Sequence, residues 1–181
     1  MEYEEKFIRR VHRFKGNIIN VETQYVLLPN GKEATRDVVL HPGAAAIVPI
    51  NEEGEIYLVK QFRKPIDQML LEIPAGKLDF LGEDPNVCAV RELKEETGLT
   101  AKNMKHVSSV FSCPGFCNEV LHIYIATGIN VGQSCTDEDE FLSVEKYHIN
   151  DLKKMIYDGS IRDGKTIIGI FAADRYLAGE F

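Results

Sequence analysis

Three glutamates lie within five positions of one short segment, "RELKEETGL", residues 91–99. At about 100° of rotation per helical residue, the side chains of Glu92, Glu95 and Glu96 fall inside roughly 100° of arc. Like charges at this spacing destabilise an isolated helix by about 0.2–0.5 kcal/mol per pair. Two interpretations are open: a solvated acidic surface, or a site for a divalent cation, which prefers oxygen ligands.

A divalent cation held by carboxylates can screen anionic oxygens, activate water and orient an anionic substrate. The net charge of −7 argues against non-specific binding to nucleic acid or to an anionic membrane, because both favour a basic surface. An anionic substrate would therefore have to be recognised through a local basic residue or a bound metal.

Local signals place the three glutamates on one helix. Asp84 is suited to the N-cap position and Gly98 to the position just past the last turn. Within this helix, Val87, Val90 and Leu93 lie on the side opposite the carboxylates. We therefore expect these three apolar side chains to face the core.

Apolar runs predict strands in much of the remaining chain. The first 40 residues are β-rich, and Asn30-Gly31 is a strong hairpin signal between two such runs. Further strands are predicted at residues 43–50, 55–63, 69–77, 107–112, 120–126 and 141–149, and two closing helices near residues 150–158 and 164–178. Strands with interleaved helices indicate an α/β/α or α+β sandwich.

The 181 residues, 44% hydrophobic and 27% charged, have an ordinary soluble-protein composition. We expect a small β-rich domain at residues 1–40, which needs a partner surface, and a main domain at residues 41–181. The charged N-terminus does not look like a signal peptide, and no apolar run is long enough to span a bilayer. Four cysteines without a C-x-x-C pair favour reduced thiols and a cytoplasmic protein.

The acidic segment and its flanks resemble the signature of the Nudix hydrolases. That signature has a glycine, a spaced glutamate and then Arg-Glu-apolar-x-Glu-Glu-x-Gly-apolar, and residues 91–99 match its second half throughout. Six residues separate Gly76 from Glu83, where the family has five, which indicates a one-residue insertion at 79–81. The resemblance implies a Nudix α/β/α sandwich with a small N-terminal antiparallel β domain.

The same resemblance implies a ligand set for Mg²⁺ or Mn²⁺. Glu92 and Glu96 would be the primary ligands, Glu95 would share the ion or bridge to it through water, and Ala75 would add its backbone carbonyl. Arg91 and Glu83 are expected to form a salt bridge that holds the loop against the helix.

Other segments resemble the ADP-ribose pyrophosphatase subfamily, namely "LHPGAAAIVPI", "VKQFRKP", "LLEIPAGK" and "SCPGFCNE". The match implies that Arg63 contacts the substrate, although an arginine near a strand end is often only a surface charge. Glu119 would help to shape the pocket or serve as a structural acceptor. Phe116 would pack on a base or anchor its own loop.

The general base of this subfamily lies on a late loop, outside the acidic helix. The segment "CTDEDEFLSVEKY" supplies the candidates, and alignment of "FLSV" with the following strand favours Glu140, with Glu138 as second choice. A carboxylate is suitable because it needs only to accept a proton from water. A solvated acidic loop is the competing interpretation.

The resemblance implies a metal-dependent enzyme that cleaves ADP-ribose, or a related ADP-sugar, to AMP and a sugar phosphate such as ribose 5-phosphate. It also implies a homodimer that exchanges its N-terminal domains, and the negative net charge favours no nucleic-acid or membrane partner. One alternative is another nucleoside diphosphate derivative as substrate: a GDP-sugar, NADH or a dinucleoside polyphosphate. A further alternative is a sensor that binds ADP-ribose without turnover.

Overall fold

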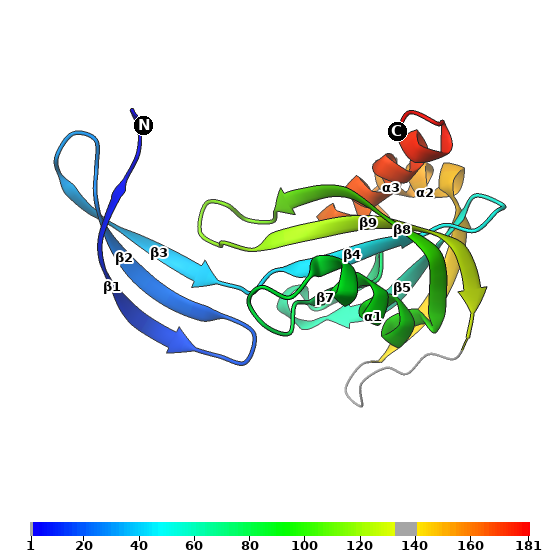
Figure 1. The fold of residues 1–181 in the computed structure, drawn as a ribbon, viewed down its shortest axis with the longest axis horizontal. Helices are drawn as coiled ribbons and strands as arrows, with labels where there is room; N and C mark the ends of the chain where they lie inside the picture. Colours follow the sequence, from blue (N-terminus) through cyan, green and yellow to red (C-terminus); the bar gives the residue numbers. More distant parts are fainter. Residues whose placement is uncertain (1, 133–140) are drawn as a thin grey trace. The chain divides into compact units, whose positions relative to one another are not determined.

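Residues 2–132 and 141–181 are described by the computed structural model, in which the chain forms two compact units. The first unit comprises the chain up to Gly43 together with residues Phe111–Val120. Its strands β1 (Lys6–Lys15), β2 (Asn20–Leu27) and β3 (Glu33–Leu40) form an antiparallel sheet in the order β1-β2-β3 (Figure 1). The predicted β-rich segment is thus a three-stranded sheet.

The predicted hairpin joins β2 to β3. Gly31 has a φ of +80°, which a residue without Cβ adopts easily, and the Lys32 N–H donates to Asn30 Oδ1 over 3.1 Å. The segment Phe111–Val120 is fastened to β3, because Val39 N–H donates to the Phe116 carbonyl and Asn118 N–H donates to the Val39 carbonyl. Residues distant in sequence therefore complete the first unit.

The second unit comprises residues Ala44–Val110 and Leu121–Phe181 and contains two sheets. Strands β10 (Leu142–His148), β5 (Glu55–Arg63) and β6 (Gln68–Glu72) form one antiparallel sheet. The other has the order β7-β4-β9-β8, with β7 (Ala75–Lys77), β4 (Ala44–Pro49), β9 (Val120–Val131) and β8 (Leu99–Phe111). In this sheet β4 runs parallel to β9.

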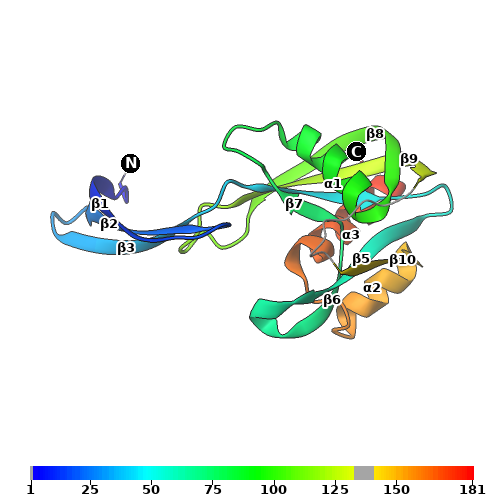
Figure 2. The same cartoon turned by 90° about the horizontal axis from the view of Figure 1, so that it is seen from below.

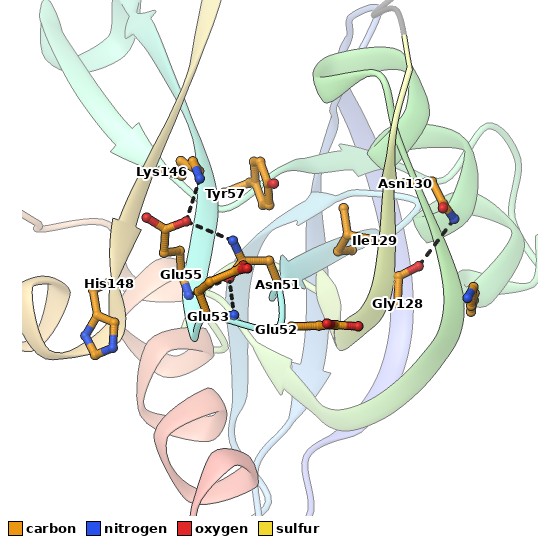
Figure 3. Close-up of a pocket in the computed structure, with 11 residues that line it drawn as sticks. Asn51, Glu52, Glu53, Glu55, Tyr57, Gly128, Ile129, Asn130, Lys146 and His148 are labelled. Carbon is orange, nitrogen blue, oxygen red and sulfur yellow. Dashed lines mark hydrogen bonds and ion pairs between the residues drawn. The ribbon is translucent and has the colours of Figure 1, made fainter.

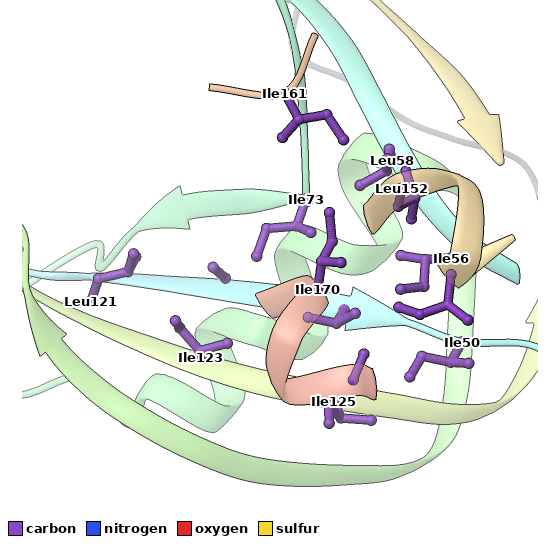
Figure 4. Packing of buried hydrophobic residues seen from close by; sticks show 14 of the residues in the cluster. Ile50, Ile56, Leu58, Ile73, Leu121, Ile123, Ile125, Leu152, Ile161 and Ile170 are labelled. Carbon is purple, nitrogen blue, oxygen red and sulfur yellow. The ribbon is translucent and has the colours of Figure 1, made fainter. Parts of the chain in front are cut away.

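Helices cover both faces of the β4–β9 sheet. Alternate β4 residues enter different cores: Val48 packs with residues of α2 (Ile149–Tyr157) and α3 (Gly164–Leu177), whereas Ile47 packs with residues of α1 (Pro85–Thr97). Figure 2 shows α1 on one side of the strands of this unit and α2 on the other, and Figure 4 shows Ile170 of α3 among the isoleucines of the core. Burial on both faces explains the continuous apolar sequence of β4. The predicted α/β/α sandwich is confirmed.

Of the helices in the two described stretches, none is long and apolar enough to span a membrane.

Candidate active site

Helix α1 has the predicted ends. Asp84 is the N-cap, its side chain accepts from the Asn86 N–H at 2.9 Å, and Pro85 is the first helical residue. Gly98 follows the helix with a φ of +70°, and its N–H donates to the Lys94 carbonyl. These caps satisfy backbone groups that would otherwise lack partners, so they fix the register of the glutamates.

The predicted orientation of α1 is wrong for two of its three apolar residues. Leu93 is buried, but Val87 and Val90 are 56% and 49% exposed. The buried stripe instead contains Cys88, Ala89, Leu93, Thr97 and two of the glutamates, Glu92 and Glu96. Small side chains at the first two positions allow α1 to approach the sheet, so the acidic face points into the protein.

Glu92 and Glu96 both converge on the start of β7. The Ala75 N–H donates to Glu96 Oε2 at 2.9 Å. A Cβ on Gly76 would lie only 2.0 Å from Cδ and Oε1 of Glu92. The absence of a side chain at Gly76 therefore lets the Glu92 carboxylate lie directly against the strand.

Arg91 binds the acidic groups around it. Its Nη1 lies 2.6 Å from Glu92 Oε1 and 3.1 Å from Glu95 Oε2, and its Nη2 lies 3.9 Å from Glu83 Oε1. Burial disfavours the guanidinium charge, but Glu92 outweighs this and raises the pKa of Arg91 above its ordinary value. The expected pairing of Arg91 with Glu83 is confirmed, and the Asp79 N–H also donates to Glu83 Oε2. The two contacts of Arg91 with predicted metal ligands were not expected.

The predicted metal ligands form a mixed set of oxygen groups. Among the residues that the structure describes, no three His, Cys, Asp or Glu side chains already form a metal site. The three predicted carboxylates are thus not gathered as a metal site in this structure: Glu92 and Glu96 are buried beside Ala75, whereas the side chain of Glu95 is 44% exposed. Carboxylate and carbonyl oxygens are the donors that Mg²⁺ and Mn²⁺ prefer, so this set fits either ion.

Arg63 has a partner that the sequence did not indicate. Its Nε and Nη2 donate to the two carboxylate oxygens of Glu72 at 2.7 and 2.8 Å. Burial opposes the charge on Glu72, but Arg63 and Lys165 outweigh it and keep the pKa of that carboxyl below its usual value. The Arg63 side chain is still 40% exposed, and its hydrogen bonds to Glu72 raise its pKa against the effect of burial, with a smaller contribution from the charge of Glu96. Arg63 is thus oriented by Glu72 and lies in the electrostatic field of the acidic helix.

The remaining predicted residues lie elsewhere. Glu119 and Phe116 belong to the first unit, where Glu119 Oε1 lies 3.3 Å from His41 Nδ1 and Phe116 is exposed. Glu138 and Glu140 fall outside the described residues.

A hollow of about 760 Å³ contains none of the predicted site residues (Figure 3). It is lined by the turn after β4 and by residues of β5, β8, β9 and β10. Of the lysines that line it, Lys146 donates to Glu55 at 2.5 Å, and Asn51 donates to the same carboxylate at 2.8 Å. These exposed groups satisfy one another, and such surface pairs contribute little energy. Size alone therefore does not make this hollow the catalytic site.

Most of the chain matches a known protein family. Residues 39–167 match the model of the NUDIX domain. The chain is 41% identical to an ADP-ribose pyrophosphatase of Bacillus subtilis over 92% of this chain and 91% of that protein. It is 39% identical to a methanol dehydrogenase activator of Bacillus methanolicus over 93% and 91% of the two chains.

The fold also has a close structural counterpart. A crystal structure of an ADP compounds hydrolase superposes with a TM-score of 0.85, covering 98% of this chain and 96% of that one at 19% identity. The capped acidic helix, the glycine beneath Glu92 and the matched domain of 129 residues, 39–167, lead to one conclusion. This chain belongs to the Nudix family.

Proposed function

We propose that this protein is a divalent-metal-dependent pyrophosphatase that cleaves the diphosphate of ADP-ribose, or of a closely related ADP-sugar, to AMP and a sugar phosphate. The observation that carries the proposal is the convergence of Glu92 and Glu96 on Ala75 and Gly76. The identity of 41% to an ADP-ribose pyrophosphatase supports the choice of substrate.

Each residue then has a defined task. Glu92, Glu96 and the Ala75 carbonyl hold Mg²⁺ or Mn²⁺, with Glu95 as an additional ligand. When bound, the cation screens the phosphate charges and supplies a Lewis acid. Arg63 binds the diphosphate, since two of its nitrogens are held by Glu72 and the rest of its partly exposed guanidinium remains available.

Other proposed roles concern residues farther along the chain. Glu140 accepts the proton of the attacking water, with Glu138 as the alternative base. Glu119 and Phe116 contribute to the substrate pocket. Separate Glu140→Gln and Glu138→Gln variants distinguish the bases, because loss of the true base lowers kcat more than loss of its neighbour.

We also propose a cytoplasmic homodimer that exchanges its N-terminal domains, residues 1–40. The small sheet leaves Phe7, Phe14 and Ile18 more than half exposed, which suits a covered interface. Light scattering should give twice the monomer mass. A fully active monomer would rule out a pocket that needs both subunits.

The decisive experiment measures AMP release from ADP-ribose at millimolar Mg²⁺. Wild type should turn over, and Glu96→Gln should lose about a hundredfold or more, as expected for the loss of a metal ligand. Glu53→Gln, which changes an exposed glutamate in the turn before β5, is the matched control and should keep full activity.

Two other results would change the assignment. Faster turnover of a GDP-sugar, NADH or a dinucleoside polyphosphate in a substrate panel would move the protein to another Nudix specificity. Tight binding of ADP-ribose without product under any divalent metal would indicate a sensor and contradict the enzymatic proposal.

A further inference from the structure

The carboxylate of Glu72 has two cationic partners, although one would satisfy its charge. Glu72 is 1% exposed and accepts from Nε and Nη2 of Arg63. Lys165 from α3 also donates to Glu72 Oε2, and its own side chain is only 14% exposed. Burial of a lysine is costly, so its presence beside an already paired carboxylate requires an explanation.

The start of helix α3 is also bound to the chain beside Glu72. Asp163, the N-cap of α3, accepts from Lys165 Nζ at 3.0 Å and from the hydroxyl of Thr166 at 2.6 Å. The hydroxyl oxygen of Thr166 in turn accepts from the Ile73 N–H at 2.9 Å, next to Glu72 in the chain. These contacts fix Lys165 relative to the end of β6.

The other end of this chain of contacts lies near the acidic helix. Arg63 Nη1 has no hydrogen-bond partner within residues 2–132 and 141–181. Glu72, which binds Arg63, precedes Ala75 by three residues, and the Ala75 N–H donates to Glu96 of the acidic helix; the Arg63 guanidinium is partly exposed. The series of ion pairs from Asp163 through Lys165 and Glu72 therefore ends at Arg63, whose Nη1 is available to bind a substrate.

We propose that Lys165 is a positioning residue for the diphosphate: paired with Asp163 at the start of α3, it holds the Glu72 carboxylate in place, so that Glu72 orients Arg63 toward the diphosphate. Arg63, Lys165, Glu72 and Asp163 together carry no net charge, so Lys165 acts by holding Glu72 in place and not by adding positive charge. The inference rests on the proposed function, because it assigns Arg63 the diphosphate as its ligand. Lys165 itself touches no substrate in this arrangement.

Kinetics with ADP-ribose and Mg²⁺ test this role. Lys165→Met should raise KM about tenfold with kcat within about twofold, since the interaction it supports is made equally in the ground and transition states. Lys165→Arg should restore a KM close to that of wild type. Calorimetric titration with ADP-ribose in EDTA, where removal of the metal prevents turnover, should show the same order of affinities.

Lys153→Met is the matched control. Lys153 pairs with Asp174 at 2.7 Å between α2 and α3, so its loss also removes a lysine–aspartate contact of α3. Its KM should stay at the wild-type value. If Lys165→Met does not fold, Lys165→Gln takes its place in the same comparison.

An unchanged KM in a folded Lys165 variant would overturn the inference. An equal rise of KM in the control Lys153→Met would overturn it as well. A fall in kcat alone would do so too, because it indicates a merely structural role. Failure of wild type to hydrolyse any nucleoside diphosphate sugar would instead refute the proposed function, so the two failures are distinguishable.

Discussion

Gly76 determines where the Glu92 carboxylate can lie. A Cβ at this position would meet the carboxylate at 2.0 Å, although the glycine has no positive φ that would itself require a glycine. The close atoms belong to the far end of a flexible side chain, which can move aside. A side chain added at Gly76 would therefore displace the Glu92 carboxylate, a proposed metal ligand, more than it would disturb the fold.

Gly76→Ala should weaken Mn²⁺ binding by about 10- to 100-fold, because it displaces Glu92 from the strand. The free energy of unfolding should change by less than about 1 kcal/mol. Calorimetric titration with Mn²⁺ and urea unfolding measure the two quantities. Lys77→Ala, which truncates the next, exposed side chain, should alter neither; unchanged Mn²⁺ affinity in Gly76→Ala would contradict this account.

The lowered pKa of Glu72 predicts that the free energy of unfolding depends on pH. Its pKa is lowered in the folded protein from an ordinary value of 4.5, so its ionised form stabilises the fold above about pH 4.5. This contribution is lost as the pH falls through the lower folded-state pKa. Glu72→Gln should cost about 3 kcal/mol at pH 7, because Arg63 loses its buried partner, and less in acid. Urea unfolding between pH 3 and 7 tests this; a difference independent of pH would refute it.

At the scale of elements, α3 packs closely on β4 through a glycine. A Cβ on Gly169 would lie 2.8 Å from Val48 Cγ2 and 3.0 Å from Ile73 Cδ1. Both neighbours are buried and cannot move freely. Gly169 therefore determines how closely α3, the helix that supplies Lys165, can pack against β4.

Gly169→Ala should destabilise the protein by about 1–2 kcal/mol, since the cost of overpacking exceeds the gain in helix propensity. Gly164→Ala is a control on the same helix, where an added Cβ meets nothing within 4 Å. It should be neutral or slightly stabilising. Chemical denaturation compares the variants, and equal stabilities would show that the packing at Gly169 is not tight.

At the scale of the whole molecule, the first unit is closed by a segment from the middle of the chain. Besides its backbone contact with Val39, Asn118 accepts from the His41 N–H through Oδ1 at 2.8 Å. The three-stranded sheet is therefore tied to residues Phe111–Val120 and not only to its sequence neighbours.

Asn118→Ala should expose the His41 amide and lower the local opening free energy by about 1 kcal/mol. Hydrogen exchange should become faster at Val39 and His41, while the amides of α1 keep their protection. Asn103→Ala, an exposed change on β8, is the control. Unchanged exchange at His41 would contradict the role of this contact.

The sequence by itself determined the local features of this protein. Asp84, Pro85 and Gly98 mark the ends of α1, and Asn30-Gly31 marks the hairpin, because caps and turns depend on backbone conformations within a few residues. Strand β1 was not distinguished within the β-rich region, since its charged sequence is exposed and its register shifts twice. The Nudix signature gave the family because its spacing is local as well.

Only the tertiary structure decided which face of α1 is buried and what orients Arg63. Val87 and Val90 point outward because α1 approaches the sheet through smaller residues and β7 receives the carboxylates. Strand pairing sets Glu72 opposite Val59, and the Arg63 side chain reaches it from farther along β5, whereas Lys165 reaches it from 93 residues away. Such contacts depend on how separate elements pack, which periodicity within one element does not encode.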